Sequence, residues 1–223
     1  AVLTAADIPG SRHIGHLLPD YPVLIGVGEI TCFRGDAVAL VAAASEAAAR
    51  AALALIEAAY EPLPAVFSPA QAAAPDAPLV HADTPGNLLA HHVLRRGDAE
   101  RAIAQAAHVA SSSFSLPPTE HAFLEPECAV ALPDKGGMRV ISGDQGVYQT
   151  RKEVAAMLGL SETQVRVQAA AVGGGFGGKE DMSVQHHAAL LAWYTQRPVK
   201  VRLTRAESML VHPKRHAMQV AVT

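Results

Sequence analysis

A run of glycines near residue 175 constrains the backbone more than any other feature of this chain. Residues 172–180 read Val-Gly-Gly-Gly-Phe-Gly-Gly-Lys-Glu, so Phe176 is the one residue with a side chain between Gly173 and Gly178. Glycine has no Cβ and adopts positive φ, which lets successive amides approach a neighbouring group as donors. The pattern predicts a backbone that passes very close to a ligand. A glycine-rich crossover without a ligand is the alternative, which the large apolar ring of Phe176 disfavours.

The segments on either side predict how this loop is held. Residues 165–172 favour a buried strand and residues 182–196 favour a helix. The helix would carry Ala189, Leu190 and Trp193 on one face. A strand, a glycine turn and a helix N-terminus bring free N–H groups and the positive end of a helix dipole together. This arrangement predicts a site for an anion or for a metal oxo group.

Composition places the chain among globular proteins. Of its 223 residues 50% are hydrophobic and 17% are charged, and the formal net charge is -3. Lysine and arginine never occur more than two in a row, which argues against nucleic acid or an anionic membrane surface as a partner. No apolar stretch of about 18 residues predicts a transmembrane helix, and the first residues lack the layout of a secretory signal. We therefore expect a cytoplasmic protein.

The cysteines and the chain ends indicate that other parts are needed. Cys32 and Cys128 are far apart and neither belongs to a C-x-x-C pair. A disulfide framework, a zinc site and an iron–sulfur cluster are therefore unsupported within this chain. The chain opens without methionine and its last residues, 219–223, are typical of the middle of a strand. We expect a piece of a longer protein.

The first part of the chain predicts a small α+β unit. Residues 37–43 favour a strand, and Ser45 is a candidate N-cap for an alanine-rich helix over 46–59. Repeated prolines and the absence of an amphipathic period predict an extended linker that ends at Asn87.

A second unit is expected to begin near residue 88. Strands at 128–132 and 138–141 are predicted to pair as a hairpin. A helix over 147–158 should follow and end at Gly159. The remaining expected elements are a helix at 98–107 capped by Asp98, and strands at 108–116 and 199–203.

Two nucleotide-binding motifs nearly match the glycine loop, and both fail. Gly173, Gly175 and Gly178 fit G-x-G-x-x-G, but no acidic residue ends a second strand at the required spacing. The loop also fits a Walker motif up to Lys179, after which a Ser or Thr should hold magnesium. Glu180 stands there instead, and its carboxylate would repel phosphate. We do not expect nucleoside triphosphate binding.

The loop and three other segments resemble a known family. Residues 172–180 are similar to the signature loop of the molybdenum hydroxylases, the xanthine dehydrogenase and aldehyde oxidase family. The segments that agree in order and spacing are Gly35-Asp-Ala-Val-Ala-Leu-Val41 with Tyr60-Glu-Pro-Leu-Pro-Ala-Val66, Glu120-His-Ala-Phe-Leu-Glu-Pro-Glu127, and Gly143-Asp-Gln145. The resemblance spans nearly the whole chain and points most strongly to the xanthine dehydrogenases.

The resemblance implies an α+β fold with two partial domains. Residues 1–70 would form most of an α/β hammerhead domain, residues 71–87 a linker, and residues 88–223 the first part of a molybdopterin-binding domain. The implied cofactor is molybdenum bound to molybdopterin, as Mo-pterin or as Mo-pterin cytosine dinucleotide. Iron–sulfur clusters and FAD would lie on other domains or subunits.

The resemblance also assigns site residues. Gln145 matches the glutamine whose amide hydrogen-bonds a molybdenum oxygen ligand, and Phe176 matches the ring that packs on a planar substrate, its own amide approaching the metal site. Gly174, Gly175 and Gly177 would complete the cofactor contacts. An amide donor suits an oxo group and an aromatic face suits a heterocycle. The residue alone favours a side chain that bonds its own helix, and only the resemblance assigns Gln145 to the metal site.

Glu180 narrows the class of substrates that we expect. A carboxylate at a helix N-terminus fits a surface acid that compensates the dipole. In the purine-hydroxylating members of the family, however, a glutamate follows the loop lysine and reaches the heterocycle. The resemblance therefore implies a xanthine or hypoxanthine dehydrogenase. The alternatives are an aldehyde or other N-heterocycle hydroxylase and a non-catalytic assembly module.

The implied reaction is hydroxylation of an electron-poor ring carbon with oxygen derived from water. The resemblance places the catalytic glutamate base beyond residue 223, so the catalytic residue is unknown here and the chain alone is expected to be inactive.

Two other groups of side chains are candidates for metal binding or for acid–base catalysis. The pairs His91–His92 and His186–His187 point about 100° apart if helical and do not easily close on one ion. Glu125 and Glu127 flank a proline and form a candidate carboxylate pair.

Overall fold

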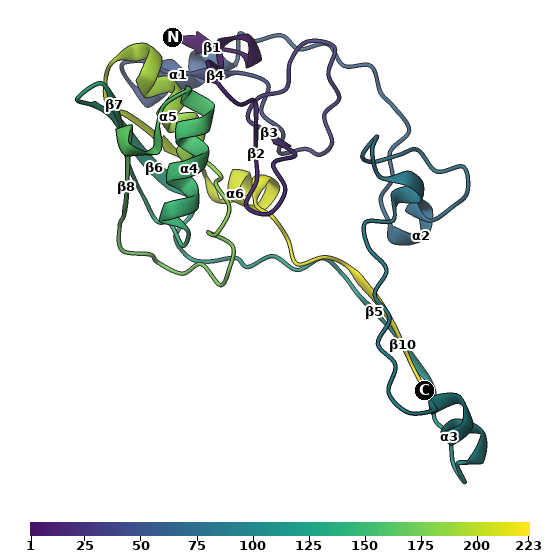
Figure 1. Ribbon diagram of the computed structural model, residues 1–223. Coiled ribbons are helices and arrows are strands. Elements are labelled where there is room, and N and C mark those ends of the chain that lie inside the picture. The colour runs from purple at the N-terminus through teal and green to yellow at the C-terminus, as the bar shows by residue number, and fades with distance from the viewer. The chain divides into compact units, whose positions relative to one another are not determined.

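The structure is a computed structural model that describes all 223 residues (Figure 1). The chain divides into two compact units, one made of residues 1–57 and 120–214 and the other of residues 58–119 and 215–223. Helices and strands are mixed in both, which confirms the expected α+β class. No helix has the length and apolar character needed to cross a membrane.

A four-stranded sheet organises the first unit. Its strands are β6 (Cys128–Asp134), β7 (Gly137–Ser142), β8 (Val165–Ala169) and β9 (Val199–Arg202), in the order β8-β7-β6-β9. The expected hairpin of β6 and β7 is confirmed, and β7 pairs in parallel with β8. The prediction of a buried strand over 165–172 is wrong in two respects. The strand ends at Ala169, and only Val165 is buried because β8 lies at the sheet edge.

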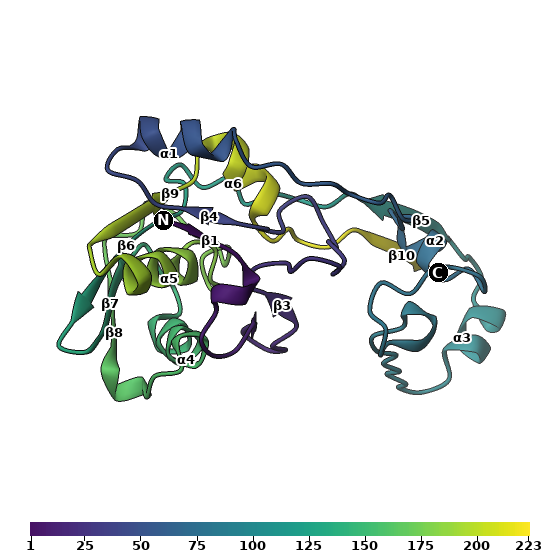
Figure 2. The same ribbon diagram turned by 90° about the horizontal axis from the view of Figure 1, so that it is seen from above.

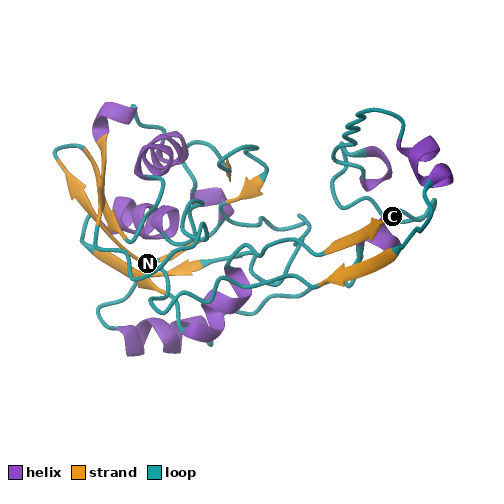
Figure 3. Cartoon of the chain, turned by 90° about the horizontal axis from the view of Figure 1, so that it is seen from below, coloured by secondary structure: helices purple, strands orange, loops and turns teal.

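Two helices cover one face of this sheet, as Figures 2 and 3 show. Helix α4 (Val147–Leu158) ends as predicted at Gly159, which has the left-handed φ of 66°. Helix α5 (Gln185–Thr195) begins three residues later than expected. The Gln185 side chain accepts hydrogen bonds from the two preceding backbone N–H groups, 3.0 Å away each, and so closes the start of the helix.

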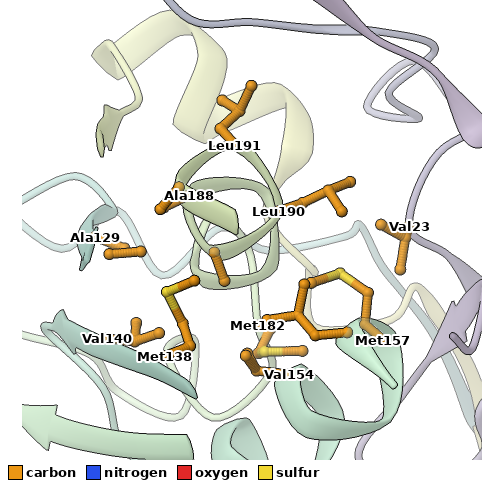
Figure 4. Packing of buried hydrophobic residues seen from close by; sticks show 14 of the residues in the cluster. Val23, Ala129, Met138, Val140, Val154, Met157, Met182, Ala188, Leu190 and Leu191 are labelled. Atoms are coloured by element: carbon orange, nitrogen blue, oxygen red, sulfur yellow. The ribbon is translucent and has the colours of Figure 1, made fainter. Parts of the chain in front are cut away.

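The core lies between the helices and the sheet (Figure 4). Met138 of β7 and Met157 of α4 are fully buried, as is Leu190, which points from α5 toward Val23 of the N-terminal segment. Each such side chain contributes about 1.5 to 3 kcal/mol through the removal of apolar surface from water. Ala189 is buried as expected, whereas Trp193 is only partly buried.

Short elements of the N-terminal segment complete the first unit. The 3-10 turn η1 covers Ala5–Asp7; β1 (Val2–Leu3) pairs with β4 (Leu40–Val41), and β2 (His13–Ile14) pairs with β3 (Tyr21–Pro22). The strand predicted at 37–43 is thus reduced to two residues. Ser45 caps α1 (Glu46–Leu53), since its Oγ accepts from Ala48 N at 3.2 Å. The cap is as predicted, but the helix ends at Leu53 rather than at residue 59.

Helix α6 (Arg205–Val211) was not predicted, although a sequence signal existed. Thr204 and Glu207 form a capping box, in which the Thr204 N–H donates to the Glu207 carboxylate at 2.6 Å. Ser or Thr followed three residues later by Glu is a recognised helix start. The 3-10 turn η3 (Glu162–Gln164) follows α4.

The second unit contains no buried residue. Its elements are α2 (Pro69–Ala72), the 3-10 turn η2 (Pro85–Asn87), α3 (Ala99–Gln105) and the antiparallel pair β5 (Ser112–Leu116) and β10 (Met218–Val222). The Asp98 cap of α3 is confirmed by a 3.0 Å bond from Arg101 N. The expected linker is not extended throughout, because the Asn87 amide bonds Val80, Pro78 and Ala72 backbone atoms.

Candidate functional site

The candidate site lies at one end of the strands of the sheet, where four chain segments meet. The register pairs Ser142 with Ala129 and with Ala169, and Cys128 with Arg202. The carboxyl ends of β7, β8 and β9 therefore lie beside the amino end of β6. Ligands of sheet proteins commonly bind beyond the carboxyl ends of parallel strands. Gln145, the glycine loop and the segment before β6 all emerge there.

The structure brings Gln145 and the glycine loop together. Lys179 N donates to Gln145 Oε1 at 3.1 Å, and Gln145 N donates to Lys179 O at 2.9 Å. A Cβ on Gly175 would lie 2.4 Å from Gln145 Oε1, so only glycine leaves room for this amide. The alternative of a side chain that bonds its own helix is not observed. Asp144 bonds the start of helix α4 instead, because its carboxylate accepts from Gly146 N and from the Thr150 hydroxyl.

The loop backbone is strained at its aromatic residue. Phe176 has φ of 54°, which residues with a Cβ rarely adopt, while Gly174 and Gly177 take φ of 96° and 87° at no steric cost. The Phe176 ring is nevertheless 74% exposed. A strained residue that presents an apolar ring to its surroundings is typical of a ligand contact.

Protein side chains occupy the close approaches that the glycines permit. A Cβ on Gly173 would lie 2.8 Å from Glu125 Cβ, and one on Gly178 would lie 2.3 Å from His212 Nε2. The expectation of close backbone approach is met, but the neighbours seen here belong to the protein itself. At these two positions glycine is explained by packing.

Lys179 is buried and paired. Its side chain is 3% exposed, and its Nζ lies 3.0 Å from Glu125 Oε2 and 4.6 Å from the centre of the Phe123 ring. The hydrogen bond from Gly173 N, followed by that from Lys179, lowers the pKa of Glu125. A lysine held in this way is not free to reach a phosphate, which adds a structural reason against a Walker site.

Glu125 and Glu127 lie in different environments. Glu125 is partly exposed and bonds the glycine loop, whereas Glu127 is 3% exposed and neither of its carboxylate oxygens has a hydrogen-bond partner. The structure gives no support to their use as an acid–base pair.

A second contact holds the other end of the loop. His212 Nε2 lies 2.7 Å from Gly178 O, and His212 Nδ1 lies 2.7 Å from Glu120 Oε1. Glu120, His121 and His212 are close enough to share a metal ion. The Lys214 ammonium already pairs with Glu120. Burial raises the pKa of Glu120, but the hydrogen bonds from Lys214 and from Ala122 N outweigh it, and the net shift is downward.

Glu180 lies at the edge of a cavity of about 370 Å³. Residues 14–18 and 20–23, Asp181, the buried His186 and the half-buried His187 contribute to its lining, whereas Gln145 and Phe176 do not. Glu180 is exposed. The expectation that it sits at a helix N-terminus is wrong, because α5 begins five residues later. The helix dipole therefore gives no explanation for this carboxylate.

His186 and His187 are packed into the protein. Their ring centres are 3.9 Å apart, and His187 Nε2 lies 3.0 Å from Val23 O. Burial lowers the pKa of both, that of His187 to about 4. The two imidazoles are thus neutral near pH 7.

Comparison with known proteins identifies the family. Residues 80–223 match the family described as molybdopterin cofactor-binding domain, and residues 1–64 match the aldehyde oxidase and xanthine dehydrogenase a/b hammerhead domain. The chain belongs to this molybdenum hydroxylase family, which confirms the resemblance. The boundaries 1–70, 71–87 and 88–223 stay a prediction.

Individual relatives agree with this assignment. The chain is 38% identical over its whole length to a subunit of a probable xanthine dehydrogenase of Bacillus subtilis, and it spans 29% of that subunit. It is 39% identical over 98% of its length to a nicotinate dehydrogenase large molybdopterin subunit of Eubacterium barkeri, of which it spans 51%. The structure of the aldehyde oxidoreductase of Desulfovibrio gigas superposes on 99% of the chain with a TM-score of 0.88 and 30% identity, and the chain spans 26% of that protein.

Proposed function

We propose that this chain is the molybdopterin-binding portion of a purine hydroxylase that acts on xanthine or hypoxanthine. The enzyme would place oxygen derived from water on a carbon of the heterocycle. The observation that carries the proposal is the hydrogen bond from Lys179 N that holds the Gln145 amide against the same loop that exposes the Phe176 ring.

The donor set fits a molybdenum–pterin group. Because Gln145 Oε1 already accepts from Lys179 N, the NH₂ of the same amide is left to donate outward. Such a donor suits an oxygen ligand of the metal. Gly174, Gly175 and Gly177 present backbone without side chains on the same loop. We assign these residues and Phe176 to the contacts of Mo-pterin or of Mo-pterin cytosine dinucleotide, which would supply the oxygen transfer and accept the two electrons.

Two side chains would position the substrate. The Phe176 ring is exposed on a strained backbone and offers an aromatic face to a planar heterocycle. Glu180 follows four residues later and lines a cavity to which Phe176 does not contribute. The family resemblance, not a shared cavity, assigns its carboxylate to a hydrogen bond with the ring N–H groups of a purine. The proton-abstracting base would come from a part of the enzyme outside this chain.

The complete enzyme would contain further redox groups. Neither Cys32 nor Cys128 lies in a cluster-binding pattern. We therefore assign iron–sulfur clusters and FAD to other domains or subunits, and expect this chain alone to be inactive. The chain spans 29%, 51% and 26% of the length of the three relatives named above.

A second candidate substrate is a smaller N-heterocycle such as nicotinate. The 39% identity with a nicotinate dehydrogenase subunit favours it. An aldehyde is a third candidate, on account of the aldehyde oxidoreductase structure.

Replacement of Glu180 should separate purines from the other substrates. In the intact enzyme, Glu180→Ala is expected to raise KM for xanthine about tenfold or more, because a hydrogen bond to a charged group is lost. KM for an aldehyde should stay unchanged, since an aldehyde offers no ring N–H. Steady-state kinetics on xanthine, nicotinate and benzaldehyde would measure this.

The matched control is Glu162→Ala, which removes an exposed carboxylate paired with Arg151. Equal changes in KM for xanthine and benzaldehyde in Glu180→Ala would contradict the purine assignment. Metal analysis of the wild-type enzyme tests the broader proposal, because a preparation without stoichiometric molybdenum would leave only an assembly role.

A further inference from the structure

One carboxylate oxygen joins the two ends of the glycine loop. Glu125 Oε2 accepts from Gly173 N at 2.7 Å and from Lys179 Nζ at 3.0 Å. The Glu125 backbone N–H also faces Gly173 O, at 3.4 Å. The first and the last residue of the stretch 173–179 are therefore tied through a single atom of a residue that lies about 50 positions earlier.

The contact between Glu125 and Lys179 also affects Gln145. Lys179 bonds the Gln145 side chain through its N–H and the Gln145 backbone through its carbonyl. A displacement of Lys179 would therefore release the amide oxygen of Gln145 and let the amide rotate. The orientation of the Gln145 NH₂ group thus depends on where Glu125 holds Lys179.

Two nearby glycines leave room for Glu125 and Lys179, because a side chain at either position would crowd them. A Cβ on Gly173 would lie 3.0 Å from Glu125 Oε2, and one on Gly143 would lie 3.5 Å from the same oxygen and 3.6 Å from Lys179 Nζ. Lys179 is buried, whereas Glu125 is half-exposed. A carboxylate oxygen can accept from the Gly173 N–H and from the charged lysine at once, and its charge strengthens the bond to the lysine.

We propose that Glu125 and Lys179 are positioning residues of the molybdenum site, which set the orientation of the Gln145 amide by clasping the two ends of the glycine loop. This inference rests on the proposed function, because the orientation of the Gln145 amide affects catalysis only if the amide bonds the molybdenum cofactor. Neither residue needs to touch cofactor or substrate. The predicted signature is a fall in kcat at nearly constant KM and constant metal content.

The test uses Glu125→Gln in the intact, molybdenum-loaded enzyme. Glutamine keeps an acceptor for Gly173 N–H but offers no charge to Lys179. We expect kcat per molybdenum to fall about 10- to 100-fold, as is usual when a residue that supports a metal site is changed. Hydrogen exchange of the peptide 170–181 should become faster, which reports the opening of the loop without any need for turnover.

A second variant guards against a failure of Glu125→Gln to assemble. Glu125→Asp keeps the charge and moves the carboxylate back by one methylene, so it should give a smaller fall in kcat and a smaller rise in exchange. Lys179→Arg, which keeps a charged donor for Glu125, should retain more activity than Lys179→Met. Glu162→Gln, in an exposed ion pair on the same unit, should change neither readout.

The outcomes separate this inference from the proposed function. Wild-type kcat per molybdenum and wild-type exchange in both Glu125 variants would overturn the positioning role and leave the enzyme assignment intact. Activity that falls only in proportion to metal content would equally overturn it, since the role would then be structural. A wild-type protein without molybdenum would sink the proposed function, while the exchange of peptide 170–181 would still decide whether Glu125 clasps the loop.

Discussion

Gln145→Glu is expected to lower kcat of the intact enzyme about 100-fold with little change in KM, because a donor to developing charge is lost. The substitution is nearly isosteric. A glutamate oxygen still accepts from Lys179 N, so the loop keeps its contact. What disappears is the amide NH₂, the donor that we assign to the cofactor. Steady-state kinetics normalised to molybdenum content would measure the effect.

The matched control for this change is Gln168→Glu. Gln168 lies on the exposed edge strand β8, and its Oε1 accepts from Arg139, which a carboxylate would also satisfy. It undergoes the same chemical change away from the loop and should leave kcat unaltered. If Gln145→Glu retains wild-type kcat at full metal content, the amide has no role in catalysis.

Acid is expected to destabilise the first unit through two histidines of α5, the half-buried His187 and the buried His186. His187 has its pKa lowered by burial to about 4, against about 6.5 in an unfolded chain. Between these two pH values the unfolded state binds more protons than the folded state, so stability decreases as pH falls. The stability is fully present above about pH 6.5, and His187 alone would account for a loss of about 3 kcal/mol by pH 4. His186 shifts in the same direction.

Urea unfolding of the intact protein at a series of pH values would measure this loss. His187→Gln keeps a donor for Val23 O and cannot titrate, so the variant should show a shallower decrease between pH 6.5 and 4. Glu153 acts with the opposite sign, since burial raises its pKa and its protonation in the folded state offsets part of the loss. An identical pH dependence in wild type and variant would contradict the prediction.

The residue pattern predicted those elements whose signals are local. The hairpin of β6 and β7, the α4 stop at Gly159 and the caps at Ser45 and Asp98 were all confirmed. Each depends on neighbours within a few positions. The ends of α1, β8 and α5 were placed wrongly, because they depend on packing and on side chains such as Gln185 that fold back over the helix start.

The candidate site was predictable in part. The glycine loop, Gln145, Phe176 and Glu180 were identified from the resemblance, and the structure places the first three together. Their assigned roles stay predictions. The parts played by Glu125 and His212 were missed, since each acts on a loop residue more than 30 positions away and no local pattern reports such a contact.

The order of residues alone specifies the glycine loop and the family. Consecutive glycines around one aromatic residue restrict the backbone locally, and segments in a fixed order resemble one class of enzyme. The folded chain was needed to show that Glu125 bonds both ends of the loop and that Lys179 is buried and paired with Glu125. These contacts follow from the strand register. β7 pairs in parallel with β8 and antiparallel with β6, and this brings Gln145, Lys179 and Glu125 to the same end of the sheet's strands. No short stretch of residues predicts how strands that are distant in the sequence pair.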